Sequence, residues 1–163
     1  MVIRPPGSAD VDAIVDMGER MHRESVYAFL PYNREKVQRL FRAFVDHPET
    51  WGGFVAEDDG KIVGMIGGYL TDYFFCDEKL ASDMILFLDQ PYRGGLTSGR
   101  LIRAFEQWAI ERGARELCLG ISTGINIDSI GRFYEHMGMT RVGAVYKRRL
   151  DGEAGTNEAR RFT

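Results

Sequence analysis

The sequence predicts a single α/β (α+β) domain in which a mixed, mostly antiparallel sheet is flanked by about four helices. Three observations predict it. Strand-like and helix-like hydrophobic patterns alternate along residues 1–150. Asp58-Asp59-Gly60 joins two strand-like runs, and Asp-Gly between such runs is a strong hairpin signal. A continuous apolar run at residues 84–88 leads through a glycine-rich turn into a helical pattern, as expected for a strand followed by a helix.

The ends of these elements carry their own signals. Pro5-Pro6-Gly7 ends the first strand, and Ser8 or Asp10 can cap the helix that follows. Asn33 caps a second helix, which closes before Pro48. We expect strands at about 2–4, 53–57, 61–70, 84–88, 117–121 and 140–150, and helices at about 11–21, 34–47, 96–112 and 127–137.

The composition is that of a globular protein, with 44% hydrophobic and 28% charged residues. A net charge of −3 argues against nonspecific binding to nucleic acid. No apolar run approaches the roughly 20 residues that span a membrane, and residues 1–8 lack the hydrophobic centre of a signal peptide. We therefore expect a cytoplasmic protein with no nucleic-acid or membrane partner, and free thiols at Cys76 and Cys118.

Residues 151–163 form a polar tail, which we expect to be mobile or to serve as an arm to a second subunit. Edge strands near the C-terminus would allow a homodimer. His22, His47 and His136 lack the spacing of metal ligands, so no metal site is expected.

The turn after the strand at 84–88 has the chemistry of an anion cradle. Pro91 ends the strand, and the small residues that follow leave backbone N–H groups free at the start of a helix, where the helix dipole favours phosphate. Arg93, Arg100 and Arg103 add positive charge nearby. No Gly-Lys-Ser/Thr occurs in the chain, and the glycines do not fit the dinucleotide fingerprint. We interpret the turn as a pyrophosphate cradle of another kind.

This stretch, Gln90-Pro-Tyr-Arg-Gly-Gly-Leu-Thr-Ser-Gly-Arg-Leu101, resembles motif A of the GNAT (Gcn5-related) N-acetyltransferases. Leu96 and Ser98 replace two residues that are usually small in that family. A second resemblance is Asn126 followed by Tyr134-Glu-His-Met-Gly-Met139, which stands where the family has its fourth helix. Met21-His-Arg-Glu-Ser25 is similar to a phage- and bacteria-associated branch of uncharacterised GNAT proteins. The family resemblance implies a GNAT fold with six to seven strands.

The resemblance also implies a function. The protein would transfer an acetyl group from acetyl-CoA, without a metal, to an amine of a small molecule or protein by direct attack in a ternary complex. Tyr134 would protonate the departing thiolate, and a main-chain N–H near Phe87 or Leu88 would stabilise the oxyanion. The expected cofactor-binding residues are Phe87, Leu88, Arg93, Gly94, Gly95, Leu96, Thr97, Ser98, Gly99, Arg100 and Asn126.

The general base has several candidates. Asp83, Glu24, Asp77 and Glu78 could each accept the proton, as could an ordered water, although any of these carboxylates could equally be a solvated surface group. Tyr134 could likewise be only a core aromatic, because it belongs to the apolar stripe of its helix.

Two alternative functions remain open. The first is a noncatalytic module that keeps the same fold to sense CoA or to bind a protein partner, and Leu96, Ser98 and the lack of a clear base motivate it. The second is another nucleotide-binding enzyme, which the absence of both nucleotide motifs disfavours.

Overall fold

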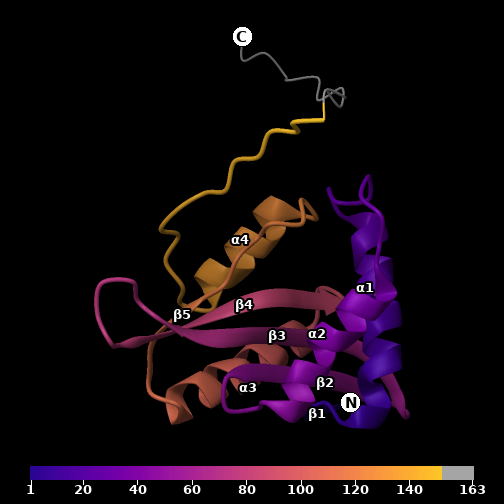
Figure 1. Cartoon of the computed structure of the whole chain (residues 1–163), viewed down its shortest axis with the longest axis horizontal. Coiled ribbons are helices and arrows are strands. Elements are labelled where there is room, and N and C mark those ends of the chain that lie inside the picture. Colours follow the sequence, from indigo (N-terminus) through magenta and orange to yellow (C-terminus); the bar gives the residue numbers. More distant parts are fainter. Residues whose placement is uncertain (152–163) are drawn as a thin grey trace.

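The computed structural model describes residues 1–151, and all of the expected polar tail at 151–163 except Asp151 lies outside the described residues. Five strands form one sheet in the order β1-β2-β3-β4-β5 (Figure 1). The first four are antiparallel, whereas β5 runs parallel to β4. The elements are β1 (Val2–Arg4), η1 (Ser8–Asp10), α1 (Val11–Glu24), α2 (Arg34–Asp46), β2 (Trp51–Asp58), β3 (Lys61–Asp72), β4 (Lys79–Leu88), η2 (Gln90–Tyr92), α3 (Leu96–Glu111), β5 (Ala114–Cys118) and α4 (Ile127–His136).

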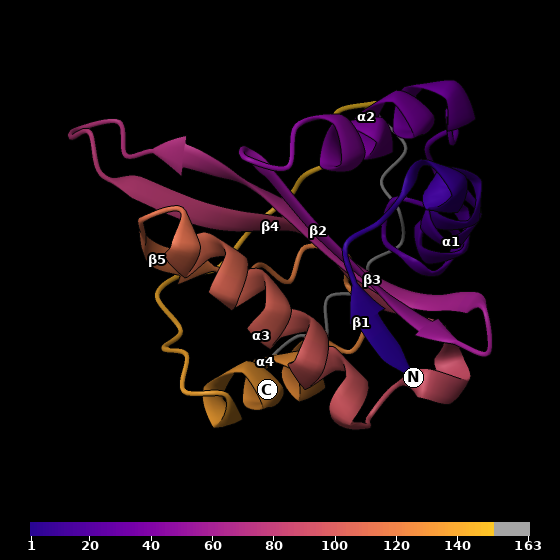
Figure 2. The same cartoon turned by 90° about the horizontal axis from the view of Figure 1, so that it is seen from below.

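The helices cover both faces of the sheet. Helices α1 and α2 lie on one face, and α3 and α4 lie on the other (Figure 2). Alternate strand residues serve the two layers: Val55 packs under α1 and α2, whereas its neighbour Ala56 packs under α3. The period-2 pattern of the central strands therefore positions both helical layers. No helix within residues 1–151 is long and apolar enough to cross a membrane.

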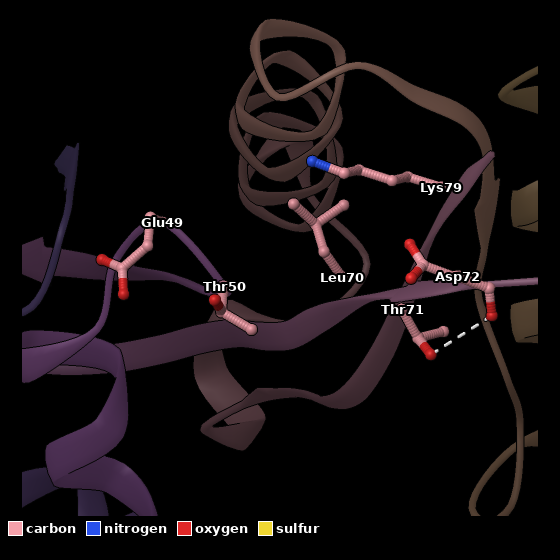
Figure 3. A pocket seen from close by; sticks show the side chains of 6 residues that line it. All are labelled: Glu49, Thr50, Leu70, Thr71, Asp72 and Lys79. Atoms are coloured by element: carbon pink, nitrogen blue, oxygen red, sulfur yellow. Dashed lines mark hydrogen bonds between the residues drawn. The ribbon is translucent and has the colours of Figure 1, made fainter. Parts of the chain in front are cut away.

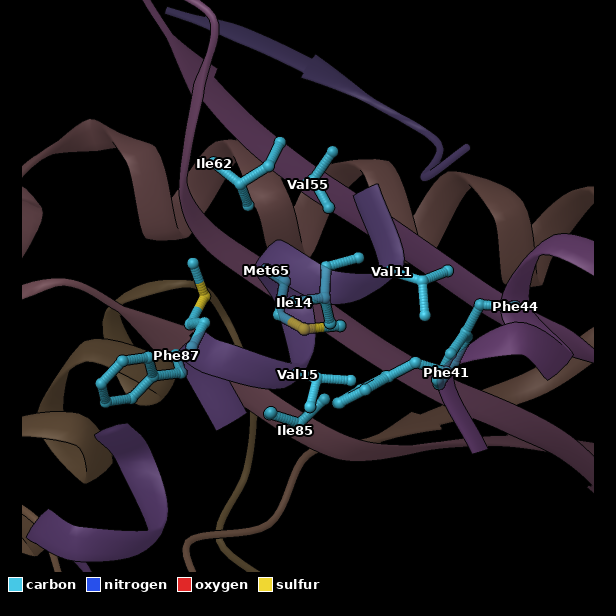
Figure 4. Packing of buried hydrophobic residues seen from close by; sticks show 11 residues of the cluster. Val11, Ile14, Val15, Phe41, Phe44, Val55, Ile62, Met65, Ile85 and Phe87 are labelled. Atoms are coloured by element: carbon cyan, nitrogen blue, oxygen red, sulfur yellow. The ribbon is translucent and has the colours of Figure 1, made fainter. Parts of the chain in front are cut away.

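The layer under α1 and α2 is a continuous hydrophobic cluster (Figure 4). Ile14 and Met17 of α1 are almost completely buried against strand residues that include Met65 and Phe87. Burying side chains of this size contributes about 1.5–3 kcal/mol each. This packing fixes α1 on the sheet and brings its C-terminal end toward the end of β4.

The predicted hairpin is confirmed, because β2 and β3 pair antiparallel around Asp59 and Gly60, both of which have positive φ. The predicted strand 84–88 is longer than expected. It begins at Lys79, because pairing with β3 continues to Asp72 opposite Lys79. We expected a connection at 71–80, and its two ends, at 71–72 and 79–80, are instead strand.

The prediction of six to seven strands is wrong for residues 1–151, where the sheet has five. The expected last strand, 140–150, is not paired to the sheet. After α4, the Met139 N–H donates to the Tyr134 carbonyl, and the Lys147 ammonium donates to the Ser122 carbonyl over 2.8 Å. The segment therefore returns along α4 to the loop before it. The alternating apolar residues favoured a strand, but this pattern does not identify a strand edge with which the segment can pair.

Candidate functional site

Within residues 1–151, the edge of β4 that faces β5 is open over about half its length. Strand β3 pairs with β4 as far as Leu88, whereas β5 pairs with it only from Lys79 to Ser82. Beyond that point the Gly120 N–H donates to a carboxylate oxygen of Asp83 over 2.7 Å. The two parallel strands therefore separate at Asp83.

A bulge marks the same place. Ile85 lies opposite Gly67 and Asp83 lies opposite Gly68, so Met84 is the extra residue in β4. A Cβ atom on Gly68 would lie 2.1 Å from the Ser82 carbonyl oxygen, so only glycine permits this close approach. The sequence did not reveal the bulge, although the pair Gly67-Gly68 inside a strand was the available signal.

The alternation of antiparallel pairing determines which backbone groups reach the open edge. The Asp89 N–H donates to the Val63 carbonyl of β3, so the backbone of Phe87 also faces β3. The backbone groups of Leu86 and Leu88 face the opposite way. Of the two residues predicted near the oxyanion, Leu88 is thus on the open edge, whereas the Phe87 side chain is buried under α1.

The predicted cradle connects this edge to α3. Gly94 has φ of +75°, and Gly95 is the N-cap residue of α3 without a side-chain capping bond. A Cβ on either glycine would have no neighbouring atom within 4 Å. The first N–H groups of α3, at Leu96, Thr97 and Ser98, consequently lie at an uncapped helix N-terminus with space around it.

The two unusual residues of the cradle differ in their placement. The Leu96 side chain is 86% exposed, so it points to solvent instead of into the core. The Ser98 hydroxyl donates to the Gly95 carbonyl over 3.4 Å. Gly99 faces α4, since its Cβ would lie 3.7 Å from the Met137 sulfur, and it therefore supports helix packing.

Arg93 points along the open edge. Its Nε donates to the Leu88 carbonyl over 2.7 Å, and its guanidinium pairs with Glu24 over 2.9 Å and lies over the Phe87 ring. Its Nη2 is buried and has no hydrogen-bond partner within residues 1–151. Glu24 is thus held by a cation at the end of α1, which favours a role in anchoring Arg93. Arg100 instead contacts the Met1 carbonyl at the surface.

Asp83 and Tyr134 form the titratable pair of the site. Burial raises the pKa of Asp83 to about 6, although the Gly120 N–H acts in the opposite direction. Tyr134 is only 8% exposed, and burial, followed by the negative charge of Asp83, raises the pKa of its hydroxyl. At neutral pH, Tyr134 is therefore a proton donor and Asp83 is close to its titration range. Such a pair can give a proton to one group and accept one from another.

The remaining predicted residues lie in two places. Asn126 is the N-cap residue of α4 in a left-handed conformation, and its side chain makes no capping bond. Asp77 and Glu78 precede β4 at the far end from the cradle, and the strand of ten residues spans roughly 33 Å. The structure therefore places these two carboxylates far from the cradle.

Two hollows on the surface lie away from this edge. One of about 280 Å³ is lined by Glu49, Thr50, Leu70, Thr71, Asp72 and Lys79 (Figure 3). The other, of about 460 Å³, lies between α1 and α2. No group of three or more His, Cys, Asp or Glu residues that could hold a metal ion occurs within residues 1–151.

Comparison with known proteins gives a consistent result. The family model for the acetyltransferase (GNAT) family matches residues 17–139. No curated protein sequence matches. Among solved structures, the fold is similar to AAC(6′)-Iy in complex with the bisubstrate analogue CoA-S-monomethyl-acetylneamine, with a TM-score of 0.72, 15% identity, and coverage of 91% of this chain and 96% of that chain.

Two further structures show the same fold. Glucosamine-6-phosphate N-acetyltransferase from Arabidopsis thaliana has a TM-score of 0.70 and 17% identity, covering 92% of this chain and 98% of that chain. A transcriptional regulator from Bacillus halodurans has a TM-score of 0.73 and 21% identity, covering 91% and 99%. With a family match over residues 17–139 and this architecture, the chain belongs to the GNAT acetyltransferase family.

Proposed function

We propose that the protein is an N-acetyltransferase that moves the acetyl group of acetyl-CoA to an amine by direct attack in a ternary complex. The observation that carries this proposal is the open edge of β4, which runs from the uncapped start of α3 to Asp83. Family membership and the CoA analogue bound in AAC(6′)-Iy support the choice of donor.

The cradle residues fit the diphosphate of the donor. Backbone N–H groups of residues 94–98 would bind it at the N-terminus of α3, where the helix dipole favours negative charge. Leu86 and Leu88 would offer backbone groups to the amides of the pantetheine arm along the open edge. When bound, acetyl-CoA supplies an acetyl group activated as a thioester.

Asp83 and Tyr134 would move the two protons. Asp83, with a pKa of about 6, would take a proton from the attacking amine, directly or through water, because it is ionised but weakly basic at neutral pH. Tyr134, whose pKa is raised, would give its proton to the departing sulfur. The Leu88 N–H would stabilise negative charge on the acetyl oxygen.

The proposal is tested by measuring free thiol release from acetyl-CoA in the presence of amines. A suitable panel includes an aminoglycoside, an amino-sugar phosphate and a peptide with a free N-terminus, because ribosomal-protein-alanine, glucosamine-6-phosphate and aminoglycoside N-acetyltransferases have similar folds. Amine-dependent thiol release with acetylated product by mass spectrometry is the expected result.

Two observations favour a noncatalytic alternative, in which the fold binds CoA as a sensor or contacts a protein partner. The Arg93 guanidinium already occupies the Leu88 carbonyl on the open edge, and Leu96 is exposed at the cradle. Thermal unfolding with acetyl-CoA separates the two functions when combined with the thiol assay. Ligand at about 100 times its Kd would add about 2.7 kcal/mol. A shift without turnover on any amine would favour the sensor.

A further inference from the structure

The connection between β3 and β4 exposes aromatic side chains. We define the aromatic tip as residues 73–78, which protrude from the body of the molecule (Figure 1). Phe74 is 99% exposed and Phe75 is 69% exposed. Adjacent large apolar side chains in such a position mark an interaction surface.

The aromatic tip is ordered by its own contacts. The Tyr73 N–H donates to the Glu78 carbonyl over 3.0 Å, and the Tyr73 hydroxyl is hydrogen-bonded to Glu116 of β5. The ring centroid of Phe75 lies 5.3 Å from that of Tyr73 and 4.9 Å from that of Phe74. A partner therefore meets three rings that are already arranged, which lowers the entropic cost of binding.

A surface hollow adjoins the aromatic tip. Its volume is about 280 Å³, and its lining includes Asp72, the last residue of β3, and Lys79, the first residue of β4. Leu70 supplies apolar lining, and the carboxylates of Glu49 and Asp72 lie on either side of it (Figure 3). A long side chain with an apolar stem and a cationic end matches this lining.

Carboxylates outnumber cations in the tip and the hollow. These residues contain the carboxylates of Glu49, Asp72, Asp77 and Glu78 and the single ammonium of Lys79. Glu78 pairs with Arg115 over 3.7 Å. Asp72 and Asp77 make no ion pair within residues 1–151, although Lys79 lies opposite Asp72 across the two strands. Unpaired carboxylates and aromatic rings both attract the charged group of a basic side chain.

We propose that the aromatic tip and the adjoining hollow form a docking site for a basic segment of another protein. A basic side chain of the segment enters the hollow, and apolar side chains beside it pack on Phe74 and Phe75. The negative charge of the site repels anionic lipid headgroups, nucleic acid and the same site of a second copy.

The docking site is remote from the cradle and does not depend on the proposed acetyl transfer. It lies at the opposite end of β4, a strand of ten residues that spans roughly 33 Å. The basic segment and acetyl-CoA therefore bind at the same time, without competition.

The test uses a short peptide of alternating arginine and leucine, labelled with fluorescein at its N-terminus and amidated at its C-terminus. This probe has no amine that the proposed reaction could acetylate. Fluorescence anisotropy measures its Kd for the full-length protein at low salt. Phe74→Ser/Phe75→Ser is expected to weaken binding about tenfold or more, and Asp72→Asn/Asp77→Asn about threefold to tenfold. Higher salt is expected to weaken binding as well.

Two variants are matched controls. Glu106→Gln/Glu135→Gln removes two exposed carboxylates from α3 and α4, and Val2→Ser removes an exposed apolar side chain from β1. Both are expected to leave the Kd for the peptide unchanged, as is saturating acetyl-CoA. Thermal unfolding of each variant verifies that it is folded.

Several results would overturn the proposal. One is a peptide that does not bind at millimolar concentration, or that binds the tip variants as well as the parent. Displacement of the peptide by acetyl-CoA would place it on the open edge of β4, and equal binding of a glutamate–leucine peptide would exclude selection for basic side chains. Sedimentation with phosphatidylcholine vesicles, or self-association, that is lost in Phe74→Ser/Phe75→Ser would identify a membrane surface or a second copy as the occupant instead.

Discussion

The two halves of β4 differ in their neighbours. From Lys79 to Ser82 the strand is paired on both sides, whereas from Asp83 to Leu88 its pairing within residues 1–151 is with β3 alone. The first half completes the sheet. The second half offers unpaired backbone groups and a half-buried carboxylate beside the uncapped end of α3. One half of the strand can therefore stabilise the sheet while the other half is available to bind a ligand. The two halves meet where β5 separates from β4, after Ser82.

The largest expected effect concerns chemistry at the open half. Tyr134→Phe removes the hydroxyl but keeps the buried ring, so kcat should fall about 10²–10⁴-fold while the Kd for acetyl-CoA changes little. Steady-state kinetics and calorimetry measure the two quantities. An unchanged kcat in an active enzyme would show that Tyr134 is only a core aromatic.

The next effect concerns the junction between the halves. Gly68→Ala places a Cβ 2.1 Å from the Ser82 carbonyl and should lower the free energy of unfolding by about 3 kcal/mol, because backbone must move. Gly95→Ala is the matched control. Its Cβ would meet nothing within 4 Å at a φ of −104°, so its stability should stay within about 0.5 kcal/mol of the parent. Urea unfolding that gave equal losses for both would contradict this account of the bulge.

A smaller effect with a defined pH dependence is expected at Asp83. Folding raises its pKa from 3.8 to about 6, so ionisation of this group opposes folding as pH rises through 6. Asp83→Asn should therefore stabilise the protein by about 1–3 kcal/mol at pH 8, and the gain should vanish below about pH 4. In the wild-type enzyme the rate should fall as the pH drops below about 6, where Asp83 becomes protonated. This acid limb of the pH–rate profile should be absent from Asp83→Asn.

Glu24→Gln provides the comparison for Asp83. It removes the ion pair with Arg93 and should make the protein less stable at pH 8, without the pH-dependent gain of Asp83→Asn. Thermal unfolding across pH measures both. If Glu24→Gln abolished the acid limb and Asp83→Asn did not, the base would be Glu24.

Local patterns were sufficient for the elements that surround the site. Asp59-Gly60 specified the hairpin, and the small residues after Pro91 specified the passage from β4 into α3, because turn chemistry and helix starts depend on neighbouring residues. The position of Tyr134 on the buried side of α4 also followed from helical spacing.

Features that depend on distant segments were not predictable. The bulge at Met84 depends on the register with β3, and the open edge depends on where β5 departs. The direction of Arg93 depends on Glu24, and whether residues 140–148 join the five-stranded sheet of the described chain depends on which strand edge they can reach. Periodicity reports which face of an element is buried, but it does not report its partner.

The attachment of α1 to the end of β4 has a consequence for folding. The Arg20 guanidinium donates to both carboxylate oxygens of Asp89, at 2.9 and 3.0 Å, and the Arg93 guanidinium pairs with Glu24. Each of these links joins residues 69 positions apart. Such contacts require closure of a long loop, and contacts of large sequence separation slow folding. The open end of β4 should therefore acquire its final geometry late, after the hairpin that it extends. A chain released before α3 is synthesised would contain the residues of both ion pairs but lack the helix whose N-terminus completes the cradle.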